Sequence, residues 1–243
     1  MKKIPVKCNL MLTDNLENMY SVGIGSITKY DKNGNEVATY SNSFLGEIHY
    51  ADVTDPFRIL LFYKEFGQIL LLNKNLSEIS DPINLDDLEI RQPGIACSSN
   101  QGGFWVYDLQ NTNLSYFNRA LEKMLVSFDV NALINQNEAP NFLIEKNDYL
   151  FLNFPKTGIV VFDRFGSFYK IIKLPNLRSF QINEKNIVFH ENNSLFSYNS
   201  DKLATTAILL PDTMGVINAR IEQNRIYIQK PENIKIYLYQ LTD

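Results

Sequence analysis

Residues 149–167 read YLFLNFPKTGIVVFDRFGS, and this stretch decides the fold. It contains two apolar and aromatic runs, 149–154 and 158–162, separated by the polar break PKTG. Runs of this length and composition are typical of β-strands, and hairpin loops require residues such as the Pro and Gly of the break. The second run ends at Asp163, and Gly166 follows as in a tight turn. The stretch therefore predicts a β-hairpin that leads through a turn into a further strand.

The same pattern recurs along the whole chain. In each copy an apolar stretch ends in Asp, Asn or Gln, and these anchor residues follow one another at intervals of about 36 to 45 residues. The anchors are Asp31, Asn73, Asn118, Asp163, Asn199 and Gln240. Asp and Asn side chains bond to their own backbone two residues on, so each anchor is expected to end one strand and begin a hairpin.

Repeats of this length, with four short strands in each, are the signature of propeller blades. The sequence therefore predicts an all-β, six-bladed β-propeller with four-stranded antiparallel blades, which forms a single domain over residues 1–243. The blades are expected to start near residues 6, 48, 94, 141, 178 and 214. A two-sheet β-sandwich is the alternative, but it gives no reason for a repeated anchor at a near-constant spacing.

The last copy stops after its third strand. Residues 2–6 are the candidate for the missing outermost strand, with residues ahead of Met1 as another source. If neither covers it, the edge at residues 235–241 would be open to a partner strand. Two further segments are irregular. Residues 81–93 are expected to connect blades two and three, and residues 121–138 could hold a short helix, although SFDV at 127–130 has outer-strand spacing.

The chain is 45% hydrophobic and 21% charged, which is the balance of a folded globular protein. Its net charge is -4 with both signs interspersed, so a broad basic face for nucleic acid is not expected. No run of 18 apolar residues occurs, so no membrane span is expected in this chain. The opening MKKIPVKC lacks the apolar stretch of a signal peptide.

The aromatic-Asp turns at residues 30–34 and 162–168 resemble the third-to-fourth-strand hairpin of six-bladed propellers of the NHL and TolB-like kind. Residues 45–79, LGEIHYADVTDPFRILLFYKEFGQILLLNKNLSEI, resemble uncharacterised propeller proteins of the Bacteroidota cell envelope. The resemblance implies an exported scaffold or binding subunit. It carries over no catalytic residue.

A divalent-cation site with oxygen ligands is one possible site, because six-bladed hydrolases and lactonases hold such an ion at the channel mouth. The candidates are Asp52, Asp55, Glu145 and Glu222, each near the beginning or end of a turn. Acidic residues are also common in turns for turn chemistry alone. No metal site, cofactor or catalytic residue is therefore assigned.

The two histidines and two cysteines offer little more. His49 and His190 are three predicted blades apart, which excludes a multi-histidine metal site. Cys97 and His49 fall on predicted innermost strands of adjacent blades, so a nucleophilic pair is geometrically possible, whereas the alternative for Cys97 is a small buried apolar residue. His190 opens the predicted turn HENNS and is expected to be exposed.

Most Phe and Tyr residues alternate on predicted strands, as packing between blades requires. Four aromatic residues lie in loops or beside glycine, and these are the candidate binding residues: Phe66, Trp105, Phe154 and Phe165. An aromatic side chain at the rim of a rigid scaffold is a frequent anchor for a protein partner. For Trp105, core packing is favoured over a role as a contact residue.

Two classes of function remain. Missing catalytic groupings and few ionisable residues on the predicted innermost strands favour a non-enzymatic protein-interaction or scaffold subunit, which binds through a propeller face or the last-blade edge. Its expected partners are proteins of a larger membrane-associated complex in the cell envelope, periplasmic or surface-exposed. The alternatives are a divalent-cation-dependent hydrolase or lyase for the function, and the cytoplasm for the location.

Overall fold

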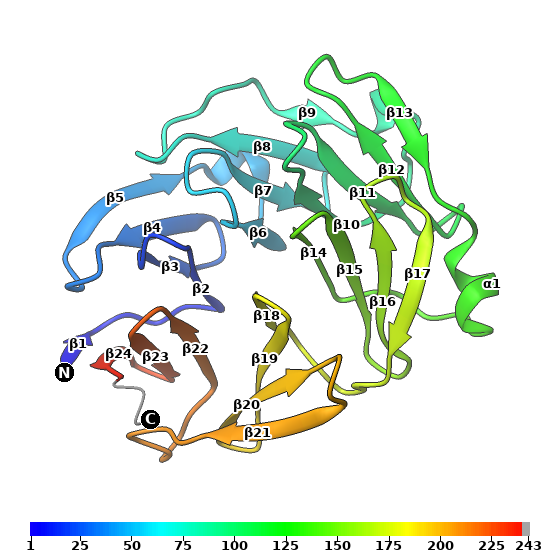
Figure 1. Ribbon diagram of the computed structural model, residues 1–243. Coiled ribbons are helices and arrows are strands. Elements are labelled where there is room, and N and C mark those ends of the chain that lie inside the picture. Colours follow the sequence, from blue (N-terminus) through cyan, green and yellow to red (C-terminus); the bar gives the residue numbers. More distant parts are fainter. Residues whose placement is uncertain (240–243) are drawn as a thin grey trace. The chain divides into compact units, whose positions relative to one another are not determined.

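The computed structural model describes residues 1–239 and shows the predicted all-β fold, a β-propeller of six blades with four antiparallel strands each (Figure 1). The contacts divide the chain into two compact units. One comprises residues 43–179, and the other comprises residues 1–42 with the segment from Phe180 onward. Each unit contributes three blades.

In the unit of residues 43–179, each strand of a blade pairs with the next one along the chain. Blade 2 consists of β6 (Tyr50–Asp52), β7 (Ile59–Tyr63), β8 (Gln68–Leu72) and β9 (Ile83–Asn84). Blade 3 consists of β10 (Pro93–Ser98), β11 (Phe104–Asp108), β12 (Asn113–Phe117) and β13 (Lys123–Val126). Blade 4 consists of β14 (Phe142–Lys146), β15 (Tyr149–Phe154), β16 (Gly158–Asp163) and β17 (Phe168–Ile172). The short helices of this unit are η1 (Ser43–Leu45), η2 (Asp86–Leu88) and α1 (Val130–Ile134).

The other unit contains blades 1, 5 and 6. Blade 1 consists of β2 (Leu10–Thr13), β3 (Met19–Val22), β4 (Ser26–Tyr30) and β5 (Glu36–Ser41). Blade 5 consists of β18 (Gln181–Asn183), β19 (Asn186–Glu191), β20 (Ser194–Asn199) and β21 (Ala204–Ile208). Blade 6 consists of β22 (Asn218–Glu222), β23 (Arg225–Lys230), β24 (Asn233–Leu238) and the N-terminal strand β1 (Lys2–Ile4).

Burial explains which residues form the middle strands. β7 reads ILLFY and all its residues are buried, because a middle strand packs on both of its faces. The outermost strand β13 instead exposes most of its side chains, and in β17 only Ile172 is buried. The decisive stretch folds as predicted, with β15 pairing with β16 from Tyr149 opposite Asp163 to Phe154 opposite Gly158.

The anchor residues of the repeat end the third strand of their blades and form Asx turns. Asp163 Oδ1 accepts hydrogen bonds from the backbone N–H groups of Phe165 (2.8 Å) and Ser167 (2.9 Å). Gly166, between these two donors, has a φ of 78°. The same side-chain bonds to positions two and four are made at Asp31, Asn73 and Asn118. The predicted role of the anchors as hairpin starts is confirmed at these residues.

Two anchors differ. Asn199 bonds to the N–H groups of Asp201 and Lys202, at positions two and three, and Gln240 lies outside the described residues. One residue outside the repeat anchors makes the same pair of bonds to positions two and four. Asp14 accepts from Leu16 and Asn18 between the first and second strands of blade 1.

Both irregular segments contain more structure than expected. Residues 81–93 were expected to be only a connection, but they include β9, in which Ile83 pairs with Ile69 of β8. The outermost strand of blade 3 is KMLV at 123–126, so the expectation that SFDV forms it is wrong. A short helix, α1, does follow. Within residues 1–239, no helix has the length and apolar character that crossing a membrane requires.

The N-terminal strand completes blade 6. Lys2 pairs with Ile236 and Ile4 with Ile234, so β1 covers the edge of β24 (Figure 1). Ile4 is buried in a cluster with Met11 and Tyr227. The prediction that residues 2–6 take the outermost position is therefore confirmed for β1. The alternative of a free β24 edge for a partner is wrong, because β1 uses the hydrogen-bonding groups of that edge.

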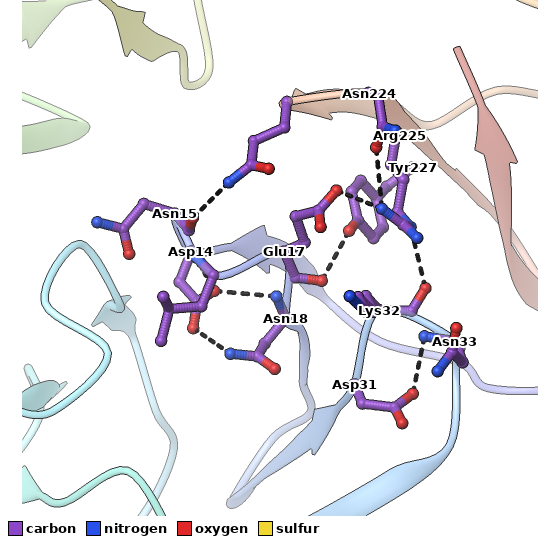
Figure 2. A network of polar contacts seen from close by, with 12 residues as sticks. Asp14, Asn15, Glu17, Asn18, Asp31, Lys32, Asn33, Asn224, Arg225 and Tyr227 are labelled. Atoms are coloured by element: carbon purple, nitrogen blue, oxygen red, sulfur yellow. Dashed lines mark hydrogen bonds and ion pairs between the residues drawn. The ribbon is translucent and has the colours of Figure 1, made fainter.

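A polar network joins blade 6 to blade 1 (Figure 2). Arg225, the first residue of β23, forms an ion pair with Glu17, and its Nε donates to the carbonyl of Lys32 at 3.2 Å. The Tyr227 hydroxyl donates to the carbonyl of Glu17 at 2.7 Å. The Arg225 and Glu17 side chains are mostly buried, so removing either one would leave the other charge poorly solvated. These bonds hold the first and last blades of the chain together.

Deletion of residues 1–5 should lower the free energy of unfolding by about 3 kcal/mol, because the buried Ile4 side chain is lost. It should also promote self-association, since β24 then has a free edge. Urea denaturation and light scattering after size-exclusion chromatography measure the two effects. The exposed Lys3→Ala substitution keeps β1 and serves as the control. A monomeric truncated protein of unchanged stability would show that β1 does not close the blade.

Replacing Gly166 with Val should destabilise the protein by about 1–2 kcal/mol, because a side chain is penalised at positive φ. Space is not the reason, since a Cβ there would lie 3.4 Å from the nearest atom, on Trp105. Thermal unfolding of this variant should be compared with that of Arg164→Val, a substitution in the same turn at negative φ. Equal melting temperatures for the two variants would remove the turn assignment.

Candidate functional site

Asp52 ends β6 and joins blade 2 to blade 3. One of its carboxylate oxygens accepts from the backbone N–H of Ser98 on β10 (2.9 Å), and the other accepts from the N–H of Thr54 (2.9 Å). The side chain is buried, and burial raises the pKa of Asp52 despite these hydrogen bonds. Asp52 therefore acts as a hydrogen-bond acceptor between two blades.

Glu145 on β14 makes the matching connection from blade 4. Its Oε1 accepts from the N–H of Asn100 (3.1 Å), and its Oε2 accepts from the indole Nε1 of Trp105 (2.9 Å). Burial raises the pKa of Glu145, and hydrogen bonds from Ser99, Asn100 and Trp105 oppose that shift. Blade 3 is thus held from both sides by buried carboxylates.

The remaining two acidic candidates also serve as hydrogen-bond acceptors. Glu222 Oε1 accepts from Thr13 Oγ1 and from Gln181 Nε2, both at 2.6 Å, within the unit that contains blades 1, 5 and 6. Asp55 Oδ1 accepts from the N–H of Phe57 at 2.9 Å and so forms an Asx turn in the β6–β7 connection. Both carboxylates therefore accept hydrogen bonds from protein donors.

The four acidic residues do not form a metal-ligating group. Residues 1–239 contain no set of three His, Cys, Asp or Glu side chains arranged to hold an ion. Asp52 and Glu145 approach the same strand, β10, but each is occupied by N–H donors. The first strands also carry more ionisable residues than the sequence suggested, because buried carboxylates are used there to join blades.

The cysteine and histidine candidates do not provide a nucleophile. Cys97 is buried on β10, and burial together with Asp52 and Glu145 raises the pKa of its thiol well above the usual range, which disfavours the reactive thiolate. His49 packs edge-on against Phe62, with ring centroids 6.0 Å apart. The expectation that His190 is exposed in a turn is wrong, since it is half-buried on β19.

Two of the four aromatic candidates are core residues, and their assignment as surface anchors is wrong. Trp105 is fully buried on β11, where its ring lies 5.2 Å from that of Tyr116. Phe154 is fully buried at the end of β15 and meets Tyr107 edge-on. Trp105 is the second residue of β11 and Phe154 is the last residue of β15, so both lie on strands and not in turns.

Phe66 and Phe165 are exposed, by 54% and 58%, but they lie at different ends of their blades. Phe165 is in the β16–β17 turn, between third and fourth strands. Phe66 is in the β7–β8 turn, between second and third strands, and its ring lies over Gly46. Successive connections of an antiparallel meander lie at opposite ends. The structure therefore does not bring these two rings together.

The end that carries Phe165 is called here the Asx-turn end, and it comprises the connections after the first and third strands of blades 2–4. Two hydrogen bonds join these connections. Arg58 Nη1 donates to the carbonyl of Gly103 (2.7 Å), and Gln101 Nε2 donates to the carbonyl of Arg164 (3.1 Å). The sequence missed Phe57, which is 59% exposed in the β6–β7 connection at this end. The sequence feature that could have indicated Phe57 is the Asx turn at Asp55, three residues after β6 ends.

Comparison with known proteins supports the fold. No family model and no curated protein matches the chain. Among solved structures it is similar to a streptogramin B lyase, at 15% identity and a TM-score of 0.61 over 94% of this chain and 78% of that one. It is also similar to virginiamycin B lyase from Staphylococcus aureus, at 12% identity and a TM-score of 0.58 over 99% of this chain and 89% of that one.

A further similar structure is the extracellular domain of a putative hybrid two-component system from B. thetaiotaomicron. The identity is 14% and the TM-score 0.56, over 96% of this chain and 33% of that one. Because all these identities are low, the likeness concerns the fold alone. The resemblance to six-bladed propellers is confirmed.

Replacing Glu145 with Ala should lower the free energy of unfolding by about 2 kcal/mol, because Trp105 Nε1 and the Asn100 N–H lose their acceptor. Urea denaturation followed by fluorescence of Trp105, the one Trp of the sequence, measures this change. Added calcium should leave the wild-type midpoint unchanged. A calcium-dependent increase that is absent in Glu145→Ala would instead identify a metal site.

Proposed function

We propose that this propeller is a non-enzymatic protein-interaction module, a scaffold subunit whose partner binds at the Asx-turn end of blades 2–4. The observation that supports it best is the pair of exposed rings Phe57 and Phe165, carried by loops of an otherwise buried β-scaffold. Exposed aromatic side chains are enriched at the centres of protein interfaces, where covering them removes apolar surface from water.

The backbone that carries each ring is fixed, and the Phe165 ring has a further contact. The N–H of Phe57 is fixed by Asp55 and that of Phe165 by Asp163, through bonds of 2.9 and 2.8 Å. The Arg164 guanidinium lies over the Phe165 ring, 4.9 Å from its centroid. A side chain that is already ordered loses less entropy on binding, so such rings are suited to act as anchors.

The same proposal places the protein in the cell envelope, periplasmic or surface-exposed, as part of a larger complex. It rests on the sequence resemblance of residues 45–79 and on the extracellular domain among the similar structures. Fractionation of the native host with an antibody against this chain tests it. Recovery only with cytoplasmic marker proteins would overturn the location.

The alternative of a cation-dependent hydrolase or lyase has no site observation in its favour. The lyases among the similar structures share only the fold at these identities. The carboxylates that would bind the cation accept hydrogen bonds from protein donors instead. Metal analysis of the purified protein remains the direct check, and stoichiometric calcium or zinc would favour the enzyme.

Replacing Phe165 with Asp should reduce recovery of the partner by tenfold or more, because truncation of a central anchor costs about 2 kcal/mol of binding. Quantitative affinity purification from the native host, with the tagged chain at matched abundance, measures the recovery. Phe66→Asp is the matched control at the other end of the blades, since the two rings are similarly exposed. Loss of the partner only in Phe66→Asp would move the binding surface to that end.

A further inference from the structure

A cavity of 360 Å³ opens between blades 2 and 3, within the unit of residues 43–179. One wall is the segment 80–88, which contains β9 and η2. The other wall is the Asx turn at 118–121, and Arg58 reaches the cavity from the β6–β7 connection. Segment 80–88 of blade 2 therefore forms one side of this cavity.

Two arginines share the wall of this cavity. Arg58 is half-buried, and only its Nη1 is used, in the bond to the Gly103 carbonyl. Arg119 follows the anchor Asn118, and its side chain lies across the turn at Gly102, where an added Cβ would come within 2.4 Å of its Nε. Burial and the neighbouring charge of Arg119 lower the pKa of Arg58. The two cations are thus held near each other although they repel.

The nearby charge of Asp55 offsets part of the charge of Arg58. In the part of the chain that the structure describes, neither Arg58 nor Arg119 forms an ion pair, although Asp81 and Asp87 also line the cavity. The two aspartates are exposed, and they make the total charge of the lining neutral. A polyanion such as nucleic acid gains little from a neutral lining. A single carboxylate, which a guanidinium can bind through two parallel hydrogen bonds, fits better.

Beside Ser80, Asn84 and Asn118, the rest of the wall is apolar. Ile83 and Leu71 are buried behind it, while Leu88 and Leu121 reach its surface. Leu121 is held in the left-handed region, with a φ of 63°, by the Asx turn of Asn118. Apolar surface beside a fixed cation pair is typical of a site that binds one charged group and one adjacent apolar group.

We propose that this cavity binds an acidic peptide segment of the protein partner. A side-chain carboxylate of the peptide lies between Arg58 and Arg119, and an adjacent apolar side chain lies against Leu88 and Leu121. This inference rests on the proposed interaction function and identifies the chemistry of the partner. Arg58 and Arg119 lie at the Asx-turn end, and Arg58 follows Phe57 in sequence, so this part of the site would extend the same binding surface.

Selection from a phage-displayed library of random dodecapeptides tests the chemistry. The wild-type protein should enrich peptides that carry Asp or Glu beside an apolar residue. A fluorescein-labelled copy of an enriched peptide should bind Arg119→Gln at least tenfold more weakly than wild type, because a charge-assisted hydrogen bond is lost. Arg119 is exposed, so this variant should fold. Arg178→Gln, an exposed arginine of the same unit outside the cavity, should bind as wild type does.

Three results would overturn the inference: no enrichment of acidic peptides, equal binding by wild type and Arg119→Gln, or equal weakening in Arg178→Gln. Displacement of the peptide by millimolar inorganic phosphate would likewise assign the site to a free anion. These outcomes are separable from the proposed function. If recovery of the partner depends on Phe165 but acidic peptides do not bind, only the cavity proposal is rejected. If recovery does not depend on Phe165 and peptide binding does not depend on Arg119, the proposed interaction function is rejected as well.

Discussion

The Asx turn after the third strand is the local constraint on which the outer part of blades 1–5 depends. One side-chain oxygen accepts two backbone N–H groups, as Asp163 does from Phe165 and Ser167, and this reverses the chain within five residues. The reversal fixes where the fourth strand begins, and therefore which of its side chains face the blade. The residues inside the turn cannot pair in a strand, and Arg119 and Phe165 remain exposed there, whereas Leu76 in the Asn73 turn is buried.

This geometry explains why the candidate binding residues lie where they do. Arg119 and Leu121 follow the anchor Asn118, Phe165 follows Asp163, and Phe57 follows Asp55. Each belongs to a turn whose backbone is fixed by a side-chain acceptor. Such turns can change their outward side chains without disturbing the strands, which is how a rigid β-scaffold can present a specific surface.

Buried carboxylates supply the second level of organisation. Asp52 and Glu145 accept hydrogen bonds from blade 3, and Glu222 accepts from Thr13 and Gln181 in the other unit. A buried N–H without an acceptor would cost more than a normal hydrogen bond gains, so these carboxylates stabilise the contacts between blades. The same positions in a metal-dependent propeller would have to leave their oxygens free. Here the acidic residues serve the structure.

The repeat, the hairpin anchors and the six-bladed fold could be predicted from the sequence, because alternation and Asx turns are local properties of a few neighbouring residues. It also indicated that residues 2–6 could close the last blade. Only the tertiary structure decided that Trp105 and Phe154 are core residues, since burial depends on what a neighbouring blade places against them. The same holds for Arg58 and Arg119, which lie in different turns and carry no motif. Their proximity arises from the packing of blade 2 against blade 3, and no spacing within the sequence encodes that contact.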